Sequence, residues 1–349
     1  MMRRIYAIWI IVLVCGASIV IATSFSGKDI DIKTENTTGS ISQPSMQEEL
    51  KKPINKINEI LVTRTLTDSI SLEEMRVMRD TLINDFISKF GKPKHPIITA
   101  EPEVPEGAYI VAFGFKIYSD GMTMEYVGIA GDAESVPIIH QRAQKWRNKE
   151  ILGSNAYWGL ICMDEGDYFK SPYGGVTNNF ECRYLYNDTS PSRDWFAIKQ
   201  EFEMVPGCVE YGSSWKNKAG YPKHDWSAST LGNPQLHEHD PLGTFTGTQT
   251  TISVSISSGG ATWSWSYTQP DVTTYDYSST NTEIAKWKMV FNSDASKGST
   301  GGMKPGSSCG VNQHISGTYR ILDLEAKGEF ANWLTNTYLT HLWHINVTY

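Results

Sequence analysis

The sequence predicts a mainly β protein, with an antiparallel β-sandwich-like body and helical segments near the N-terminus (α+β overall). Apolar and small polar residues alternate in several segments, and this period of two is typical of strands that bury one face. Gly, Pro and Asn clusters lie between those segments and indicate turns. Trp and Tyr are abundant, with 11 and 17 residues. No repeat with a period of about 20 to 50 residues is present, which argues against solenoids and propellers.

Length and charge narrow the classes of function. The chain has 349 residues, 40% of them hydrophobic, which is enough for one large domain or two ordinary ones. Its net charge is −7, and it has no basic block beyond Arg3 and Arg4. A nucleic-acid-binding protein needs clustered Lys and Arg to neutralise phosphates, so we expect no nucleic-acid partner.

The N-terminus predicts an extracytoplasmic protein. Arg3 and Arg4 precede an apolar run from Ile5 to Ala22, and no further charge appears before Lys28. This arrangement is typical of an export signal, yet the run approaches the ~20 residues that span a bilayer. Residues 1–26 are therefore a cleaved signal peptide or an N-terminal membrane anchor, and we favour the anchor slightly. An uncleaved segment makes the membrane a partner, with the rest of the chain outside.

Three further segments follow. They are a tether with a helical segment (27–100), an α+β region (101–235) and an antiparallel β domain (236–349). The tether carries a glycosylation sequon at Asn36. Ser71 and Glu74 form a capping-box pattern that predicts a helix ending before Gly91. A shorter helix is predicted over residues 48–61.

The α+β region begins with two clear strands. Alternation predicts strands over residues 109–118 and 122–129, joined by a turn at Asp120 and Gly121. A helix is predicted over 136–149, with its basic residues in solvent. Residues 154–240 are predicted to be rich in loops, with short strands, and they include a second sequon at Asn187.

The stretch from Thr251 to Thr268 predicts a β-hairpin. Apolar and small polar residues alternate on both sides of Gly259 and Gly260, and glycines readily adopt the positive φ angles of a two-residue turn. With these glycines as the loop, the register follows. The expected pairs are Ile256 with Trp263, Val254 with Trp265, Ile252 with Tyr267, Ser255 with Ser264 and Ser253 with Ser266. Every apolar residue then lies on one face, and a one-residue slip would destroy this arrangement.

The rest of the C-terminal region alternates in the same way. Strands are predicted over residues 285–291, 318–324 and 339–349, and a long loop over 292–310 because it is rich in Gly and Ser. A third sequon lies at Asn346, which we expect on the solvated face of the last strand.

Four cysteines follow the N-terminal segment. They are Cys162, Cys182, Cys208 and Cys309. An even number in an oxidising compartment favours two structural disulfides, although the sequence does not choose among the three pairings.

The densest group of metal-ligating residues is at His237, Glu238, His239 and Asp240. In a strand, His-x-His places both rings on one face, so His237, His239 and Asp240 are the candidate metal ligands. The alternative, which we favour, is a polar loop before Pro241 with no metal and no cofactor.

Aromatic residues suggest two opposite roles. Trp263, Trp265 and Tyr267 lie opposite aliphatic residues in the hairpin register, which favours a buried face over a sugar-binding surface. Trp215 and Tyr221, in a Gly-containing segment taken to be an exposed loop, are the better candidates for binding a glycan.

These observations favour a cell-surface or secreted non-enzymatic protein, with a binding or envelope-structural role and a glycan or envelope component as its partner. A secreted metal-dependent hydrolase that uses His237 and His239 is the alternative. A membrane-inserting β protein is the third hypothesis, although strongly amphipathic strands are few.

Overall fold

The structure is a computed structural model, and it describes residues 55–149, 158–186, 192–247, 250–258 and 261–349. The chain divides into two units, residues 1–45 and 46–349, and every described residue belongs to the second. The predicted signal or anchor, the tether and the sequons at Asn36 and Asn187 lie outside the described residues.

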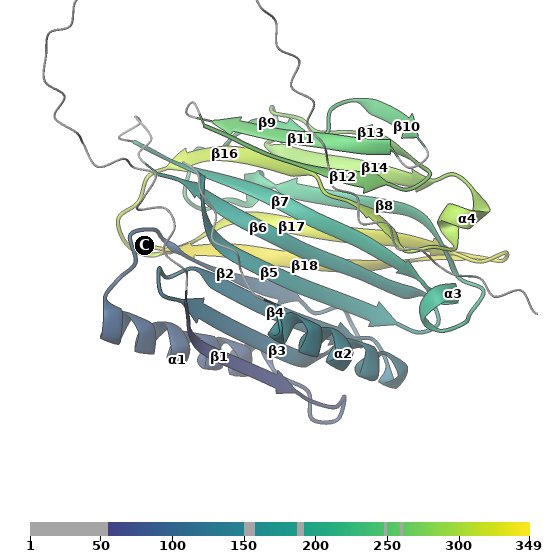
Figure 1. Cartoon of the computed structure of the whole chain (residues 1–349), viewed down its shortest axis with the longest axis horizontal. Coiled ribbons are helices and arrows are strands. Elements are labelled where there is room, and N and C mark those ends of the chain that lie inside the picture. Colours follow the sequence, from purple (N-terminus) through teal and green to yellow (C-terminus); the bar gives the residue numbers. More distant parts are fainter. Residues whose placement is uncertain (1–54, 150–157, 187–191, 248–249, 259–260) are drawn as a thin grey trace, which may run out of the picture. The chain divides into compact units, whose positions relative to one another are not determined.

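Two large sheets form the body of the second unit (Figure 1). The predicted fold class is confirmed, because the chain is mostly strand and all pairings but one are antiparallel. The larger sheet has the order β1-β3-β4-β5-β6-β7-β16-β9, and β15 also pairs with β7. Its strands are β1 (Lys56–Thr63), β3 (Tyr109–Tyr118), β4 (Thr123–Ala130), β5 (Trp158–Lys170), β6 (Gly174–Leu185), β7 (Arg193–Pro206), β9 (Gln235–Asp240), β15 (Gly301–Met303) and β16 (Gly306–Asn312).

The second sheet has the order β10-β13-β14-β8-β17-β18-β2. Its strands are β2 (Ile97–Glu103), β8 (Lys216–Asp225), β10 (Thr244–Gly247), β13 (Val272–Asp276), β14 (Ile284–Phe291), β17 (Thr318–Ala331) and β18 (Asn336–Thr348). A two-stranded sheet, β11 (Thr250–Ser258) with β12 (Ala261–Gln269), pairs with neither.

Polar side chains cross the core between the two large sheets. Asn178 on β6 donates to the backbone oxygens of Leu324 and His341, both at 3.0 Å, and these residues belong to β17 and β18. Trp343 Nε1 donates back to Asn178 O at 2.9 Å. Because these groups are buried, the bonds fix how the two sheets face each other.

Two helices pack on opposite faces of β3 and β4 (Figure 1). Helix α1 (Leu72–Phe90) begins as predicted, with Ser71 Oγ accepting from Glu74 N, and its buried Arg79 reaches Glu125 on β4. Helix α2 (Val136–Arg147) covers the other face. A Cβ at Gly128 would lie 2.1 Å from Ile139 of α2, so the glycine permits this close packing. The remaining helices are short: α3 (Gly207–Glu210), α4 (Asp294–Lys297), η2 (Ala133–Ser135) and η3 (Trp226–Ala228).

Several sequence-based expectations of secondary structure were wrong. Residues 56–61 form part of β1 rather than a helix, because Ile57 to Val62 extend along β3 and are half-buried there. The loop-rich region predicted at 154–240, with short strands, contains the strands β5 to β9, and the long loop predicted at 292–310 contains β15 and most of β16. Their Gly, Asn and Ser residues pair in the middle of a sheet, where tertiary packing outweighs local strand propensity.

The predicted boundary at residue 235 does not separate two bodies. Each large sheet takes strands from both sides of that position. The larger sheet joins β7 to β16, and the second sheet joins β8 to β17. The described residues contain no helix that is long and apolar enough to cross a membrane.

Candidate functional site

The hairpin β11–β12 is the element that sets this molecule apart from a plain sandwich. Its register agrees with the sequence-based prediction at all five pairs, from Ile252 opposite Tyr267 to Ile256 opposite Trp263. The predicted turn, residues 259–260, lies outside the described residues. The hairpin shares no ladder with either large sheet, so side-chain contacts and its chain connections to β10 and β13 hold it on the body.

The hairpin is one part of a longer two-stranded ribbon. Strands β10 and β13 pair up to Gly247 with Val272, and β11 and β12 begin with Thr250 and Gln269. Each strand advances by three residues between these two pairs, so the spacing is the same along both strands. β10–β13 lies at the edge of the second large sheet, whereas β11–β12 belongs to neither.

The two faces of the hairpin differ sharply. Val254, Ile256 and Tyr267 are buried against the body, and Trp263 and Trp265 are half-buried. The opposite face carries only Ser and Thr, and nearly all of them are exposed. No charged residue and no histidine occurs anywhere from Pro241 to Pro270.

Gly306 on β16 packs against the apolar face of the hairpin. A Cβ at Gly306 would lie 2.3 Å from Trp265 Cη2 and 3.1 Å from Ile256 Cγ1. The missing side chain therefore makes room for both hairpin residues. Two indole N–H groups complete the contact, because Trp265 Nε1 donates to Lys304 O at 2.8 Å and Trp158 Nε1 donates to Ala261 O at 3.2 Å.

Two carboxylates from β9 bond to the backbone of β11. Asp240 Oδ2 accepts from Ser255 N at 2.7 Å, and Glu238 accepts from Ser257 N. These amides face outward from the hairpin ladder, so the carboxylates satisfy an edge that would otherwise be open. We call Glu238 and Asp240 the carboxylate latch. Sequence reasoning noted both residues but missed this role, because a partner strand distant in sequence defines it.

The candidate metal ligands His237 and His239 are not arranged on one face of a regular strand. β9 pairs Leu236 with Cys309 and Glu238 with Ser308, which leaves His237 in a β-bulge. A bulge reorients its side chain, so the His-x-His rule fails. His237 contacts the ring of Trp195, and His239 Nε2 lies 3.3 Å from Asp276 Oδ2. In the part of the chain that the structure describes, no three His, Cys, Asp or Glu residues form a metal site. The segment is also strand, not the expected loop.

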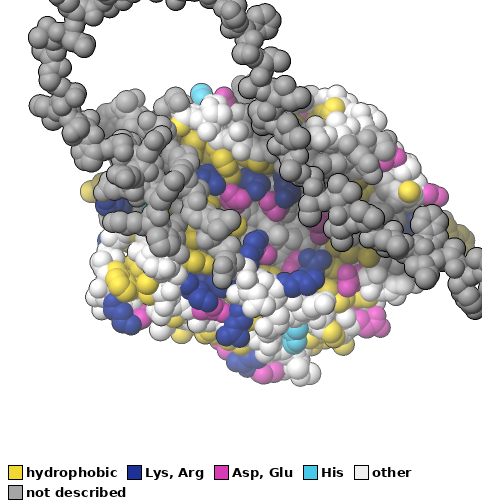
Figure 2. Space-filling view, in the orientation of Figure 1, with side chains coloured by type: hydrophobic (Ala, Val, Ile, Leu, Met, Phe, Trp, Pro, Cys, Tyr) yellow, Lys and Arg dark blue, Asp and Glu magenta, His cyan; other side chains and the backbone are white. Residues whose placement is uncertain are grey.

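A charged groove lies beside the hairpin on the outer face of β5, β6 and β7. It contains a cavity of about 640 Å³, walled by α2 on one side and by the base of β12 on the other. Figure 2 shows Lys, Arg, Asp and Glu side chains gathered across the middle of this face. Lys199 bridges Glu181 at 2.8 Å and Glu201 at 2.7 Å, and Lys304 lies 3.1 Å from Glu201. The charges thus largely compensate one another.

Arg142 of α2 lines the same groove, and Lys149 follows the end of this helix. Arg142 Nη1 lies 3.1 Å from Asp167 Oδ1 and its guanidinium lies 4.6 Å from the ring centroid of Phe169. Lys149 pairs with Glu165. The expectation of a solvated basic face was therefore wrong for Arg142, which is half-buried, whereas Lys145, Arg147 and Lys149 are exposed as expected. Across the groove, Arg183 lies 4.4 Å from the ring centroid of Trp263, so cations also contact the half-buried hairpin rings.

Buried carboxylates lie on the other face of the same sheet. Glu125 contacts Arg79 Nη1 at 3.4 Å, and Glu125 N donates to Asp164 Oδ1 at 2.8 Å. Burial raises the pKa of Glu125 to about 7, although Arg79 opposes this shift. Burial and the neighbouring Glu125 raise the pKa of Asp164 as well.

The four cysteines are free thiols in the structure. Cys162 and Cys182 are buried and directly opposite each other on β5 and β6. Cys208 and Cys309 lie on α3 and β16. The structure thus shows no disulfide among these residues, and pairing of Cys162 with Cys182 is the only one of the three arrangements that neighbouring strands would favour.

The two predicted glycan-binding aromatics do not lie in an exposed loop. Trp215 is only 8% exposed and packs edge-to-face on Tyr173, so the premise for Trp215 was wrong. Tyr221 lies on β8, half-buried, and donates to Glu329. Asn346 is half-buried near the end of β18, and its glycosylation stays a prediction.

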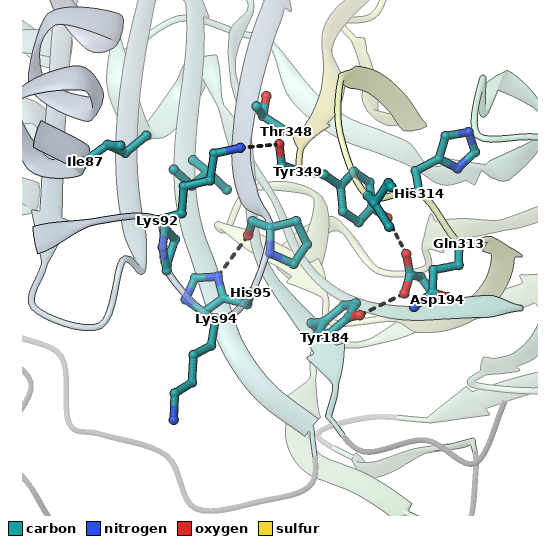
Figure 3. A pocket seen from close by; sticks show the side chains of 14 residues that line it. Ile87, Lys92, Lys94, His95, Tyr184, Asp194, Gln313, His314, Thr348 and Tyr349 are labelled. Carbon is teal, nitrogen blue, oxygen red and sulfur yellow. Dashed lines mark hydrogen bonds between the residues drawn. The ribbon is translucent and has the colours of Figure 1, made fainter. Parts of the chain in front are cut away.

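A smaller cavity of about 230 Å³ lies at another end of the sandwich (Figure 3). Asp194 lines this cavity and accepts from Tyr184 OH at 2.8 Å and from Tyr349 OH at 2.6 Å. Burial and Asp194 raise the pKa of Tyr349. Because both carboxylate oxygens are already bonded, we interpret this arrangement as a clamp that ties β18 to β6 and β7.

No protein-family model and no curated protein matches the sequence. Among solved structures, the chain is similar to Clostridium perfringens delta-toxin, with 11% identity over 53% of this chain and 87% of that chain and a TM-score of 0.33. A structure named "Pore forming protein" is 12% identical over 56% of this chain and 93% of that chain, with a TM-score of 0.33. The chain is also similar to the C-terminal domain of the Streptococcus agalactiae AgI/II polypeptide BspA, with 11% identity over 49% of this chain and 59% of that chain and a TM-score of 0.18. Likenesses at these TM-scores are loose, so function is argued from the chain's own residues.

Proposed function

We propose that the chain is an exported, non-enzymatic β protein that inserts the hairpin β11–β12 into a membrane. One observation carries the proposal: a charge-free amphipathic hairpin shares no ladder with either large sheet and follows another strand pair with equal spacing along both strands. The structure would then represent the state before insertion. Export itself rests on the N-terminal sequence, as argued above.

The hairpin meets the physical requirements of a membrane-spanning strand pair. A tilted strand needs about 9 to 11 residues to cross the hydrocarbon core, and β11 and β12 have 9 each. In such strands apolar residues face lipid and polar residues face an aqueous lumen. The hairpin has both faces already, with Val254 and Trp265 on one and Ser255 and Ser264 on the other.

A single hairpin cannot cross a bilayer alone. Its outer edges would expose unpaired backbone groups to hydrocarbon, at a cost of several kcal/mol for each group. In the structure the carboxylate latch satisfies part of one edge. In a membrane, hairpins from several copies of the chain would satisfy these edges by closing a barrel, and the Ser and Thr face would line its lumen.

Ionic conductance across a planar lipid bilayer tests this function. The purified chain should give discrete conductance steps. Ser264 is exposed, so Ser264→Lys and Ser264→Glu should both fold. If Ser264 lines the lumen, the two variants should shift the reversal potential in a salt gradient in opposite directions. A matched pair, Thr318→Lys and Thr318→Glu, changes an exposed residue at the start of β17 and should leave the reversal potential unchanged.

Two results would contradict the proposal. One is the absence of conductance with both zwitterionic and anionic lipids. The other is conductance whose reversal potential is the same in the Lys and Glu variants of Ser264, because another part of the chain would then line the pore.

A further inference from the structure

The turn between β17 and β18 exposes two large apolar side chains next to each other. Trp333 is 83% exposed and Leu334 is 70% exposed. Asn332 Oδ1 accepts from the backbone N–H groups of Leu334 and Thr335, both at 2.9 Å, and Asn332 N donates to Thr335 O at 3.0 Å. These bonds fix the turn, so the two side chains are presented in a defined geometry.

The base of the turn is firmly anchored in the body. The buried carboxylate of Glu329 accepts from Lys218 Nζ at 2.7 Å, Tyr221 OH at 3.0 Å and Asn336 Nδ2 at 2.6 Å. Phe330, the next residue, is fully buried. The exposed pair is therefore the tip of a rigid element.

The tip lies at the same end of the sandwich as the base of the ribbon. Asn292 N donates to Asp271 O next to Pro270, where the ribbon passes from β12 to β13. Asp294, at the start of α4, lies 3.8 Å from Lys216, and Lys216 pairs with Ala331 beside the turn. Figure 1 shows α4 and the β17–β18 connection at this end.

The closed end of the hairpin points the opposite way. Ala261 O is bonded to Trp158, the first residue of β5. The far end of β5 leads to Gly174, where a Cβ would lie 3.1 Å from Phe330 near the turn. The strand pairs β10–β13 and β11–β12 thus run in opposite directions along the body, and the described chain turns between β12 and β13 at residues 270–271. Straightening the chain at this turn would send the hairpin out beyond the end that carries Trp333.

A lipid surface is the partner that suits this tip. A bilayer interface accepts a protruding Trp and Leu without a complementary pocket, and Trp favours the headgroup region because its ring is apolar and its N–H is polar. Three lysine side chains lie near the tip. Lys216 and Lys218 lie on β8, and Lys327 lies 4.5 Å from the ring centroid of the half-exposed Tyr338. They would face the phosphates of the headgroups.

We propose that the Trp333–Leu334 turn is a lipid-docking site that places the base of the ribbon at the bilayer. This proposal deepens the proposed function, on which it rests for the direction of insertion. The docking step needs no movement of the hairpin, so it can be measured separately from conductance.

The test is flotation of the full chain with vesicles of phosphatidylcholine and phosphatidylserine. We expect Trp333→Ser/Leu334→Ser to lower the bound fraction at least tenfold. The matched control is Ile315→Ser, because Ile315 is 91% exposed and lies beside the cavity of Figure 3 rather than at the proposed tip. This control should bind like the unmodified chain.

A local probe removes any contribution of the apolar N-terminal segment. In a Cys15→Ser/Cys208→Ser background, an environment-sensitive fluorophore on Trp333→Cys should shift to shorter wavelength when vesicles are added, whereas the same label on Ile315→Cys should not. An unchanged spectrum at position 333 would overturn the docking site. Conductance that persists in Trp333→Ser/Leu334→Ser with unchanged flotation would overturn it and leave the proposed function intact. Docking at position 333 without any conductance would refute only the proposed function.

Discussion

Glu125 is an acidic side chain placed where its charged form is disfavoured. It is 1% exposed, and burial raises its pKa to about 7, above the ~4.3 of a free glutamate. The folded state therefore binds this proton more tightly than the unfolded state does. The resulting contribution to stability is complete below about pH 4 and is lost as the pH rises through 7.

We expect the free energy of unfolding to show this dependence. Between pH 5.5 and pH 8 the unmodified chain should lose on the order of 2 kcal/mol more than Glu125→Gln, which has no proton to lose at this site. Urea unfolding at the two pH values measures the difference. Equal losses in both proteins would mean that Glu125 is ionised throughout this range.

Residue-level roles were only partly readable from the sequence. The helix cap at Ser71 was predictable because capping depends on residues three positions apart. The roles of the latch residues Glu238 and Asp240 were not predictable, and neither was the space that Gly306 leaves for Trp265. Each of these residues contacts a strand that is distant in sequence and that only the fold brings near. The bulge at His237 likewise appears only once β16 is in place.

At the scale of the element, the carboxylate latch should control release of the hairpin. We expect Glu238→Ala/Asp240→Ala to expose the aromatic residues of β12 to chymotrypsin and to raise the rate of cleavage there about tenfold or more. The physical reason is the loss of two charge-assisted hydrogen bonds to Ser255 and Ser257. Limited proteolysis followed by mass spectrometry locates the cuts.

His237→Ala is the control for this experiment, because His237 directly precedes the latch residues on β9 but contacts Trp195. Cleavage at the same rate in the control and the double variant would show that the latch does not hold the hairpin.

The hairpin shows what sequence periodicity can predict about an element. Alternation and a two-residue turn determine its register completely, because a slip of one residue would reverse its faces. The same pattern does not say which surface receives the apolar face. That surface includes Gly306 and Trp158, which are far apart in the sequence.

At the scale of the whole molecule, the two large sheets interleave strands from distant parts of the chain. β2 pairs with β18, and β9 pairs with β16. Fold class was predictable from composition and alternation, whereas strand order was not, since local patterns carry no information about which strands become neighbours. The lengths of strands β5 to β7 were underestimated for the same reason.

The proposed function also predicts a change in the state of association. With vesicles present, cross-linking should capture multimers of the chain, because the edges of an inserted hairpin must be paired. Trp333→Ser/Leu334→Ser should give fewer multimers under the same conditions. Detection of only single chains in vesicles that conduct ions would contradict a barrel built from several copies.

The equal spacing of the two strands restricts how the length of the ribbon can vary. Because Gly247 pairs with Val272 and Thr250 pairs with Gln269, three positions further along each strand, a residue added to one strand must be matched by a residue in the other. Additions in twos keep each side chain on its own face. Related chains would therefore be expected to differ here by matched insertions or deletions, and each such step would lengthen or shorten the ribbon by about 7 Å.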